Sequence, residues 1–252
     1  MLIVFDIIWL IPLGFAAGVV GSIIGLGGGI IVVPVLTFLG VPHTITASSS
    51  LFAAFSNSIA ASASYAKQKR VDYKIGLRLG LLSVPGTVIG ALISAQVTPA
   101  FFKITFGIIL IASCYYLFIK RKIEPKSSVP KYMAVASAAI SFFAGILSSF
   151  FGIGGGIVFV PLMIIGLGML VKNATATSQL ILIFSSLSGL VAHTLLGHSD
   201  FEYALLLSIG AFGGGLLGAR LSVELKENSI RLLICGVIVI AAIKLFLDAF
   251  NV

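Results

Sequence analysis

The feature that most constrains this chain is a series of apolar runs, each about as long as a bilayer core is thick. A spanning helix needs about 20 apolar residues. Such runs occupy residues 2 to 24, 45 to 66, 75 to 96, 101 to 119, 132 to 151, 174 to 197, 202 to 222 and 230 to 249. Only 10% of the 252 residues are charged, against about 25% in soluble domains. The sequence therefore predicts an all-α polytopic membrane protein embedded in a lipid bilayer.

Two shorter apolar runs, 30 to 40 and 157 to 170, each follow a glycine cluster. The clusters read GLGGGIIVVP at 25 to 34 and GIGGGIVFVP at 152 to 161, identical at seven of ten positions. Further matches at an offset of 127 to 129 residues pair TASSSL at 46 to 51 with TATSQL at 175 to 180, and GALIS at 90 to 94 with GARLS at 218 to 222. The sequence therefore consists of two similar halves, which form an internal repeat.

Each repeat has four long helices and one short helix after a glycine break. Residues 2 to 119 form the first repeat, 120 to 131 a basic linker and 132 to 250 the second repeat, all within one transmembrane domain, 1 to 252. We expect the N-terminal run to be the first spanning helix rather than a cleavable signal peptide, because no basic segment precedes it.

The loop charges indicate that the two repeats are inverted. KQKRVDYK at 67 to 74 is strongly basic, whereas its counterpart GHSDFE at 197 to 202 has two acids and no Lys or Arg. Basic loops stay in the cytoplasm, so these loops are predicted on opposite sides. The linker is then cytoplasmic and both termini are outside the cell membrane. This topology counts the short segments as crossings, and whether they cross or re-enter is left open.

The glycine breaks are the first candidate site, because inverted repeats around broken helices are the plan of secondary transporters. Gly25 and Gly152 with Pro34 and Pro161 are candidate hinge residues. Unpaired N–H groups at a broken helix favour an anion, which makes substrate-binding candidates of Gly27, Gly28, Gly29, Gly154, Gly155 and Gly156. The alternative is that these glycines only permit close helix packing.

The segments that follow the breaks carry many hydroxyl and amide groups and no carboxylate. Such donors can replace part of the hydration shell of an oxyanion. The candidates are Ser48, Ser49, Ser50, Ser56 and Asn57 in the first repeat, with Thr177, Ser178, Gln179 and Ser185 in the second. The alternative is that each hydroxyl bonds a carbonyl of its own helix or joins two helices.

Ionisable groups within the spans are few. His43, Lys172 and His193 are candidates for attracting anions or protons, although each can also be an ordinary residue near a helix end. No carboxylate lies deep in a span, which argues against an acidic proton relay. Cys114 and Cys235 lack metal-ligand spacing, so we expect no metal or cofactor, and the formal net charge of +8 reflects loops rather than a nucleic-acid surface.

The duplicated G-[LI]-GGG-I motif with its later proline, the A-[ST]-S-x-L segment and the late glycine motif together resemble the sulfite exporter TauE/SafE family, also described as a toluene sulfonate uptake permease family. The resemblance implies a permease for small sulfur-containing anions such as sulfite or organosulfonates, with no enzymatic activity. An anion channel and a membrane anchor subunit are the alternatives. The anion, its direction, the coupling ion and a homodimer are left undecided by the sequence.

Overall fold

The computed structural model describes residues 7–98 and 131–225, together with 100–102, 104, 105, 107, 108, 111, 115, 229, 232, 236, 239, 240, 242 and 243. Its helices are α2 (Leu10–Ile24), α3 (Gly29–Phe38), α4 (His43–Lys67), α5 (Tyr73–Ser94), α7 (Lys131–Phe151), α8 (Gly156–Pro161), the π-helix η1 (Leu162–Gly166), α9 (Val171–Leu195) and α10 (Phe201–Leu221). Most of the expected runs 101 to 119 and 230 to 249, the linker and both cysteines lie outside the described residues.

Three of these helices, α5, α9 and α10, are long and apolar enough to cross a membrane. Large apolar side chains point outward from α5 and α10, among them Leu81, 58% exposed, and Leu205, 63% exposed. An outward apolar surface of this kind is typical of contact with lipid. The regular structure of the described residues is all helical and agrees with the expected membrane protein. Helix α4 is more polar than the other long helices and keeps most of its serines buried.

The first helix of the chain packs against the last long helix that the structure describes in full. Gly14 of α2 lies against the backbone of Leu207 in α10, and Gly18 lies against Ala211. The two helices are therefore parallel, and each glycine lets the neighbouring backbone come close.

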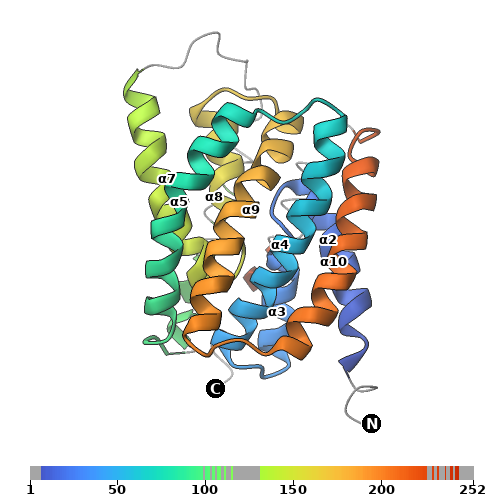
Figure 1. Ribbon diagram of the computed structural model, residues 1–252, viewed down its shortest axis with the longest axis vertical. Coiled ribbons are helices and arrows are strands. Elements are labelled where there is room, and N and C mark those ends of the chain that lie inside the picture. The colour runs from blue at the N-terminus through green and yellow to red at the C-terminus, as the bar shows by residue number, and fades with distance from the viewer. Residues whose placement is uncertain are drawn as a thin grey trace.

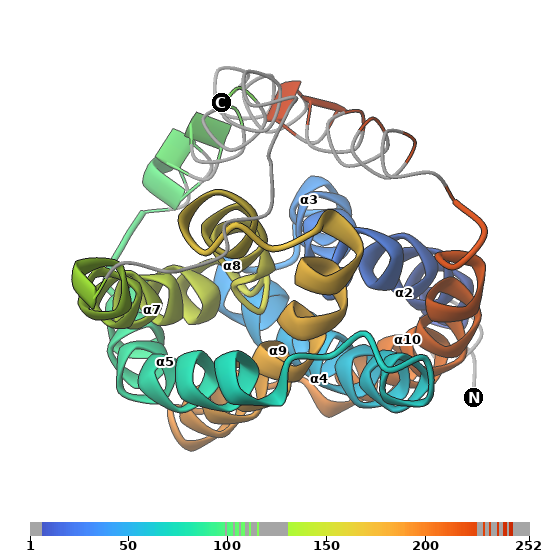
Figure 2. The same ribbon diagram turned by 90° about the horizontal axis from the view of Figure 1, so that it is seen from above.

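The same contact recurs between α7 and α5. Ser141 of α7 donates a hydrogen bond to the Leu79 carbonyl of α5, and Gly145 lies against the backbone of Ser83. The halves are thus interlocked, because the first helix of each half packs on the third long helix of the other half. In Figure 2 these two pairs lie on opposite sides of the molecule, with α3, α4, α8 and α9 between them.

The polar helices α4 and α9 cross the middle of the molecule in opposite directions. Asn57 near the middle of α4 contacts Gln179 of α9, while Arg70, beyond the end of α4, reaches Lys172 at the start of α9. Helix α10 runs parallel to α4, as α5 does to α9. Consequently α2, α4 and α10 point one way and α5, α7 and α9 the other, which Figure 1 also shows.

Each short helix turns back along the helix before it. Gly28, which precedes α3, lies against Ala17 of α2, and Gly155, which precedes α8, lies against Ser148 of α7. In Figure 1, α3 ends near the start of α4, at the end of the molecule from which α2 begins. The glycine breaks are therefore the tips of two helical hairpins that enter the molecule from opposite ends.

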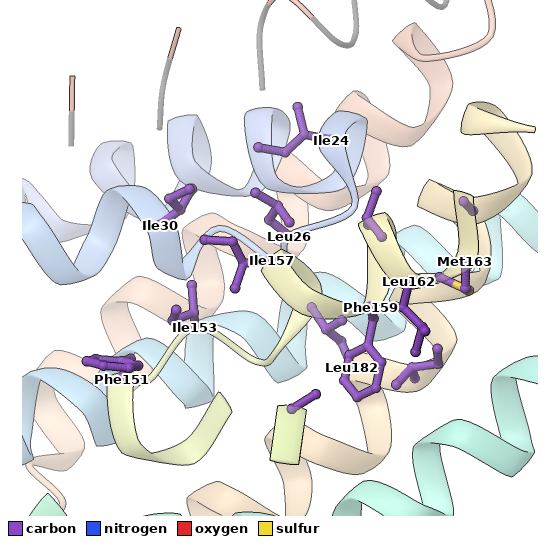
Figure 3. Packing of buried hydrophobic residues seen from close by; sticks show 14 of the residues in the cluster. Ile24, Leu26, Ile30, Phe151, Ile153, Ile157, Phe159, Leu162, Met163 and Leu182 are labelled. Carbon is purple, nitrogen blue, oxygen red and sulfur yellow. The ribbon is translucent and has the colours of Figure 1, made fainter. Parts of the chain in front are cut away.

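The two hairpin tips lie side by side and antiparallel. A Cβ atom at Gly29 would be 2.7 Å from the Gly152 carbonyl oxygen, and one at Gly156 would clash with the Gly25 carbonyl. Figure 3 shows the surrounding core, in which Leu26 and Ile157 belong to one cluster of buried side chains. The largest core of the described residues is built around this crossing.

Candidate functional site

The glycines of both breaks have left-handed backbone conformations that disfavour any side chain. The φ angles are 79°, 76° and 85° at Gly25, Gly27 and Gly28, and 74°, 77° and 89° at Gly152, Gly154 and Gly155. Gly29 and Gly156 are helical, and their role is close contact with the opposite break. Both breaks are buried, so the glycines provide the turn and also the packing that the sequence left as an alternative.

Several backbone N–H groups of the breaks have no acceptor within the described part of the chain. They belong to Gly28, Gly29 and Ile30 in the first break and to Gly154, Gly155, Gly156 and Ile157 in the second. Buried N–H groups without an acceptor are rare, because each one loses its hydrogen bond to water. The two breaks therefore offer donors, and no negative side chain, at the centre of the molecule.

Helix α9 holds both breaks through its polar side chains. Ser178 donates to the Gly25 carbonyl at 2.7 Å, and Ser185 donates to the Gly154 carbonyl at 2.6 Å. Gln179 donates to the Gly21 carbonyl at 3.0 Å, just before the first break. These three candidates therefore contact the breaks, and Ser178 and Ser185 use their hydroxyl hydrogens on protein carbonyls.

Helix α4 has matching residues with different partners. Ser49 and Ser50 are completely buried, and neither hydroxyl has a partner among the described residues. Ser56 donates to the Ser208 carbonyl of α10 instead of to a break. Asn57 donates to the Gln179 side-chain oxygen at 3.4 Å, while its own side-chain oxygen has no partner in the part of the chain that the structure describes.

The two remaining polar candidates lie away from the breaks. The Ser48 hydroxyl bonds Ser199 in the loop after α9 at 2.7 Å. Thr177 accepts from the backbone N–H of Asp72, just before α5.

Two buried serines of α7 were missed in the sequence, and Ser186 of α9, one of the hydroxyl residues of 175 to 188, was not among the substrate-binding candidates. Ser148 and Ser149 on α7 and Ser186 on α9 are buried, and their hydroxyls have no partner in the described structure. Ser186 lies beside Gly154, and Ser148 beside Gly155. A signal was present for the α7 pair, because the letters SSFFGIGGG place two hydroxyls directly before the second glycine cluster.

The candidate histidines lie together at the end of the molecule where α9 ends and α4 begins. The Ser149 carbonyl can only accept, so His193 donates to it from Nε2 and accepts on Nδ1 from His198, 3.1 Å away. Partial burial lowers the pKa of His198, and the nearby His43 lowers it further. His43 contacts the Ser94 carbonyl at 3.0 Å.

The opposite end is closed by cationic side chains. Arg70 donates to the Ser222 hydroxyl and to the Lys172 carbonyl, both at 2.9 Å, and its guanidinium lies 4.8 Å from the centre of the Tyr65 ring. Lys172 donates to the Val223 carbonyl at 2.9 Å. His43 and Lys172, which match in the repeat, thus lie at opposite ends and both bond backbone carbonyls near the ends of neighbouring helices.

The two candidate prolines act differently. Pro34 lies inside α3, which stays α-helical to Phe38. Pro161 ends α8, and the chain continues as the π-helix η1. A proline removes one hydrogen bond of its helix, and only the second repeat responds with a change of helix type.

The described residues include no group of three or more His, Cys, Asp or Glu side chains that could hold a metal ion. The candidate site is thus a buried crossing of two glycine breaks with neutral donors around it, and side chains at each end of the molecule bond backbone carbonyls of neighbouring helices. Neutral hydroxyl and N–H donors suit a small anion that must be released again.

Comparisons with known proteins agree with this description. A family model described as "Sulfite exporter TauE/SafE" matches residues 10–245. "Probable membrane transporter protein YunE" of Bacillus subtilis is 35% identical over 264 residues, covering 95% of this chain and 97% of the relative. A "Probable membrane transporter protein" of Methanocaldococcus jannaschii is 29% identical, covering 93% and 94%. No solved structure shows a significant match.

Proposed function

Because the chain belongs to the sulfite exporter TauE/SafE family of membrane transporters, we propose that it is a secondary transporter for sulfite or a related organosulfonate. The observation that carries the proposal is the crossing of the two breaks, where backbone N–H groups and buried hydroxyls lie together without partners among the described residues. We place the substrate there, against Gly27–Gly29, Gly154–Gly156 and the polar faces of α4 and α9.

The transport cycle follows from the interlocked arrangement. The matching helices α4 and α9 run in opposite directions, which supports a pair of inverted repeats with the site where they meet. Each end of the site is closed by a different set of contacts, around His43 at one end and Arg70 at the other. Opening one set while the other stays closed would expose the substrate to one side of the membrane at a time.

The charge distribution supports one orientation in the cell membrane. The basic residues Lys67, Lys69, Arg70 and Lys74 gather at the end where α4 finishes, and basic loops are cytoplasmic. Export of an anion from a cell that is negative inside gains about 2.3 kcal/mol per charge per 100 mV. Export therefore needs no coupled ion, whereas uptake would.

The test replaces one glycine at each hairpin tip, in protein reconstituted into liposomes. Gly28→Leu and Gly155→Leu should abolish counterflow of sulfite, because φ values of 85° and 89° strain any side chain and both positions are closely packed. Gly28→Ala serves as a milder change and should retain measurable, slower transport.

The matched control is Gly197→Leu. Gly197 also has a left-handed conformation, with φ 73°, but a Cβ there would have no atom within 4 Å. The Gly197→Leu variant should insert into the membrane and transport sulfite almost as fast as the unmodified protein does. Normal rates in Gly28→Leu and Gly155→Leu would remove the breaks from the mechanism, while uptake that never saturates would indicate a channel.

A further inference from the structure

Two matching sets of three residues surround the breaks and differ in their hydrogen bonding. In the first set, Asn57 donates to Gln179 at 3.4 Å and Gln179 donates to the Gly21 carbonyl at 3.0 Å. The repeat offset of 127 to 129 residues pairs Gly21, Asn57 and Gln179 with Ser148, Ser186 and Ser50. None of these three serine hydroxyls has a partner among the described residues.

Ser148 and Ser186 border the second break, and Ser50 lies beside Gly29 of the first break, where the two breaks cross. The Ser50 hydroxyl would be 2.9 Å from a Cβ at Gly29, which itself lies against Gly152. The Ser186 hydroxyl would be 3.0 Å from a Cβ at Gly154, and Ser148 Cβ 3.1 Å from one at Gly155. The N–H groups of Gly154 to Ile157, which have no acceptor among the described residues, lie on this second break.

The donors at this place call for a partner that accepts hydrogen bonds. All three serines are 0% exposed, and a buried hydroxyl without a partner is unfavourable. Hydroxyls alone could also face a cation, but backbone N–H groups carry partial positive charge and repel one. A group with several acceptor oxygens fits both kinds of donor.

We infer that the protein binds one oxyanion at a time, off the centre of its pseudosymmetric core, with Ser50, Ser148 and Ser186 as its hydroxyl donors. The Asn57 and Gln179 amides fill the matching place beside the first break, where amide groups bonded to each other and to the Gly21 carbonyl replace the three hydroxyls. This inference rests on the proposed function, and it adds Ser148 and Ser186 to the substrate contacts while making the site single and one-sided.

The test measures the KM of sulfite counterflow in liposomes for Ser50→Ala, Ser148→Ala and Ser186→Ala. Each loses one hydrogen bond to a charged group, so KM should rise about tenfold. Ser148→Gly is a second variant at that position, since glycine is the residue that the repeat itself places at 21. Thermal unfolding in detergent checks that each variant is folded.

The control is Ser62→Ala, which also truncates a buried serine whose hydroxyl lacks a partner in the described structure. Ser62 lies on α4 with Ser50 but about 18 Å further along the helix, at 1.5 Å per residue, and its KM should not change. Calorimetric titration with sulfite should give one equivalent per chain.

The possible failures separate the two proposals. Saturable sulfite transport in the unmodified protein, together with an unchanged KM in all three serine variants, would overturn the one-sided site alone. Two equivalents per chain would do the same. Absence of any saturable uptake of sulfite, thiosulfate or sulfoacetate by the unmodified protein would overturn the proposed function, and this site with it.

Discussion

At the scale of single residues, matching serines of the two halves make different hydrogen bonds. Ser178 and its counterpart Ser49 occupy matching places, yet Ser178 donates to the Gly25 carbonyl while the Ser49 hydroxyl has no partner within the described ranges. The sequence could identify both as polar residues near a break, because spacing along a helix determines its faces. It could not assign their partners, since these depend on how closely two distant backbones approach.

His198 gives a prediction about pH at this scale. Its pKa lies below the ordinary value of 6.5, first through burial and then through His43. The unfolded chain therefore binds more protons than the folded one as pH falls through that range, so the folded state loses stability. We expect a lower melting temperature at pH 5.5 than at pH 7.5, by fluorescence of the detergent-solubilised protein.

The variant His198→Asn separates this effect from other titrations. Asparagine can still donate to Nδ1 of His193 but does not titrate. Between pH 7.5 and pH 5.5, the melting temperature of the variant should therefore fall by less than that of the unmodified protein. An equal loss in both proteins would show that His198 is not the group responsible.

At the scale of elements, the sequence predicted the helices and the positions of both breaks, because long apolar runs and glycine clusters are local signals. The return of α3 along α2 was left open, since an apolar run has the same composition whichever way it points. The pairing of α2 with α10 was also not predicted. The spacing of four residues between Gly210, Gly214 and Gly218 is typical of a close helix contact, and all three lie against the α2 backbone.

The α2 and α10 contact gives a prediction that compares neighbouring glycines. A Cβ at Gly214 would clash with the Phe15 carbonyl, whereas one at Gly213 would meet only the Phe15 ring at 3.5 Å. Gly214→Ala should therefore lower the free energy of unfolding by about 1 to 3 kcal/mol. Gly213→Ala should be neutral or stabilising by up to about 1 kcal/mol, because alanine favours the helix.

Thermal or denaturant unfolding in detergent measures both variants. Equal stability of the two variants would mean that α2 and α10 are not packed as closely as their glycines imply.

At the scale of the whole molecule, the antiparallel course of α4 and α9 puts two repeat-related loops at opposite ends. Lys69, after α4, and His198, after α9, should therefore face opposite sides of the membrane. With Cys114 and Cys235 replaced by serine, an impermeant maleimide applied to intact cells should label His198→Cys and not Lys69→Cys. Inverted vesicles should give the reverse pattern. Labelling of both from one side would contradict the proposed topology.

The interlocked pairing also has a consequence for how the protein is made. Helix α2 finds its partner α10 almost 200 residues later in the chain, as Gly18 and Ala211 show. Ribosomes add about 5 to 20 residues per second, so α2 waits roughly 10 to 40 s in the membrane with its glycine face uncovered. Neither half can complete its own packing during synthesis. Biogenesis must therefore hold a half-built protein in the membrane until the second half arrives to cover it.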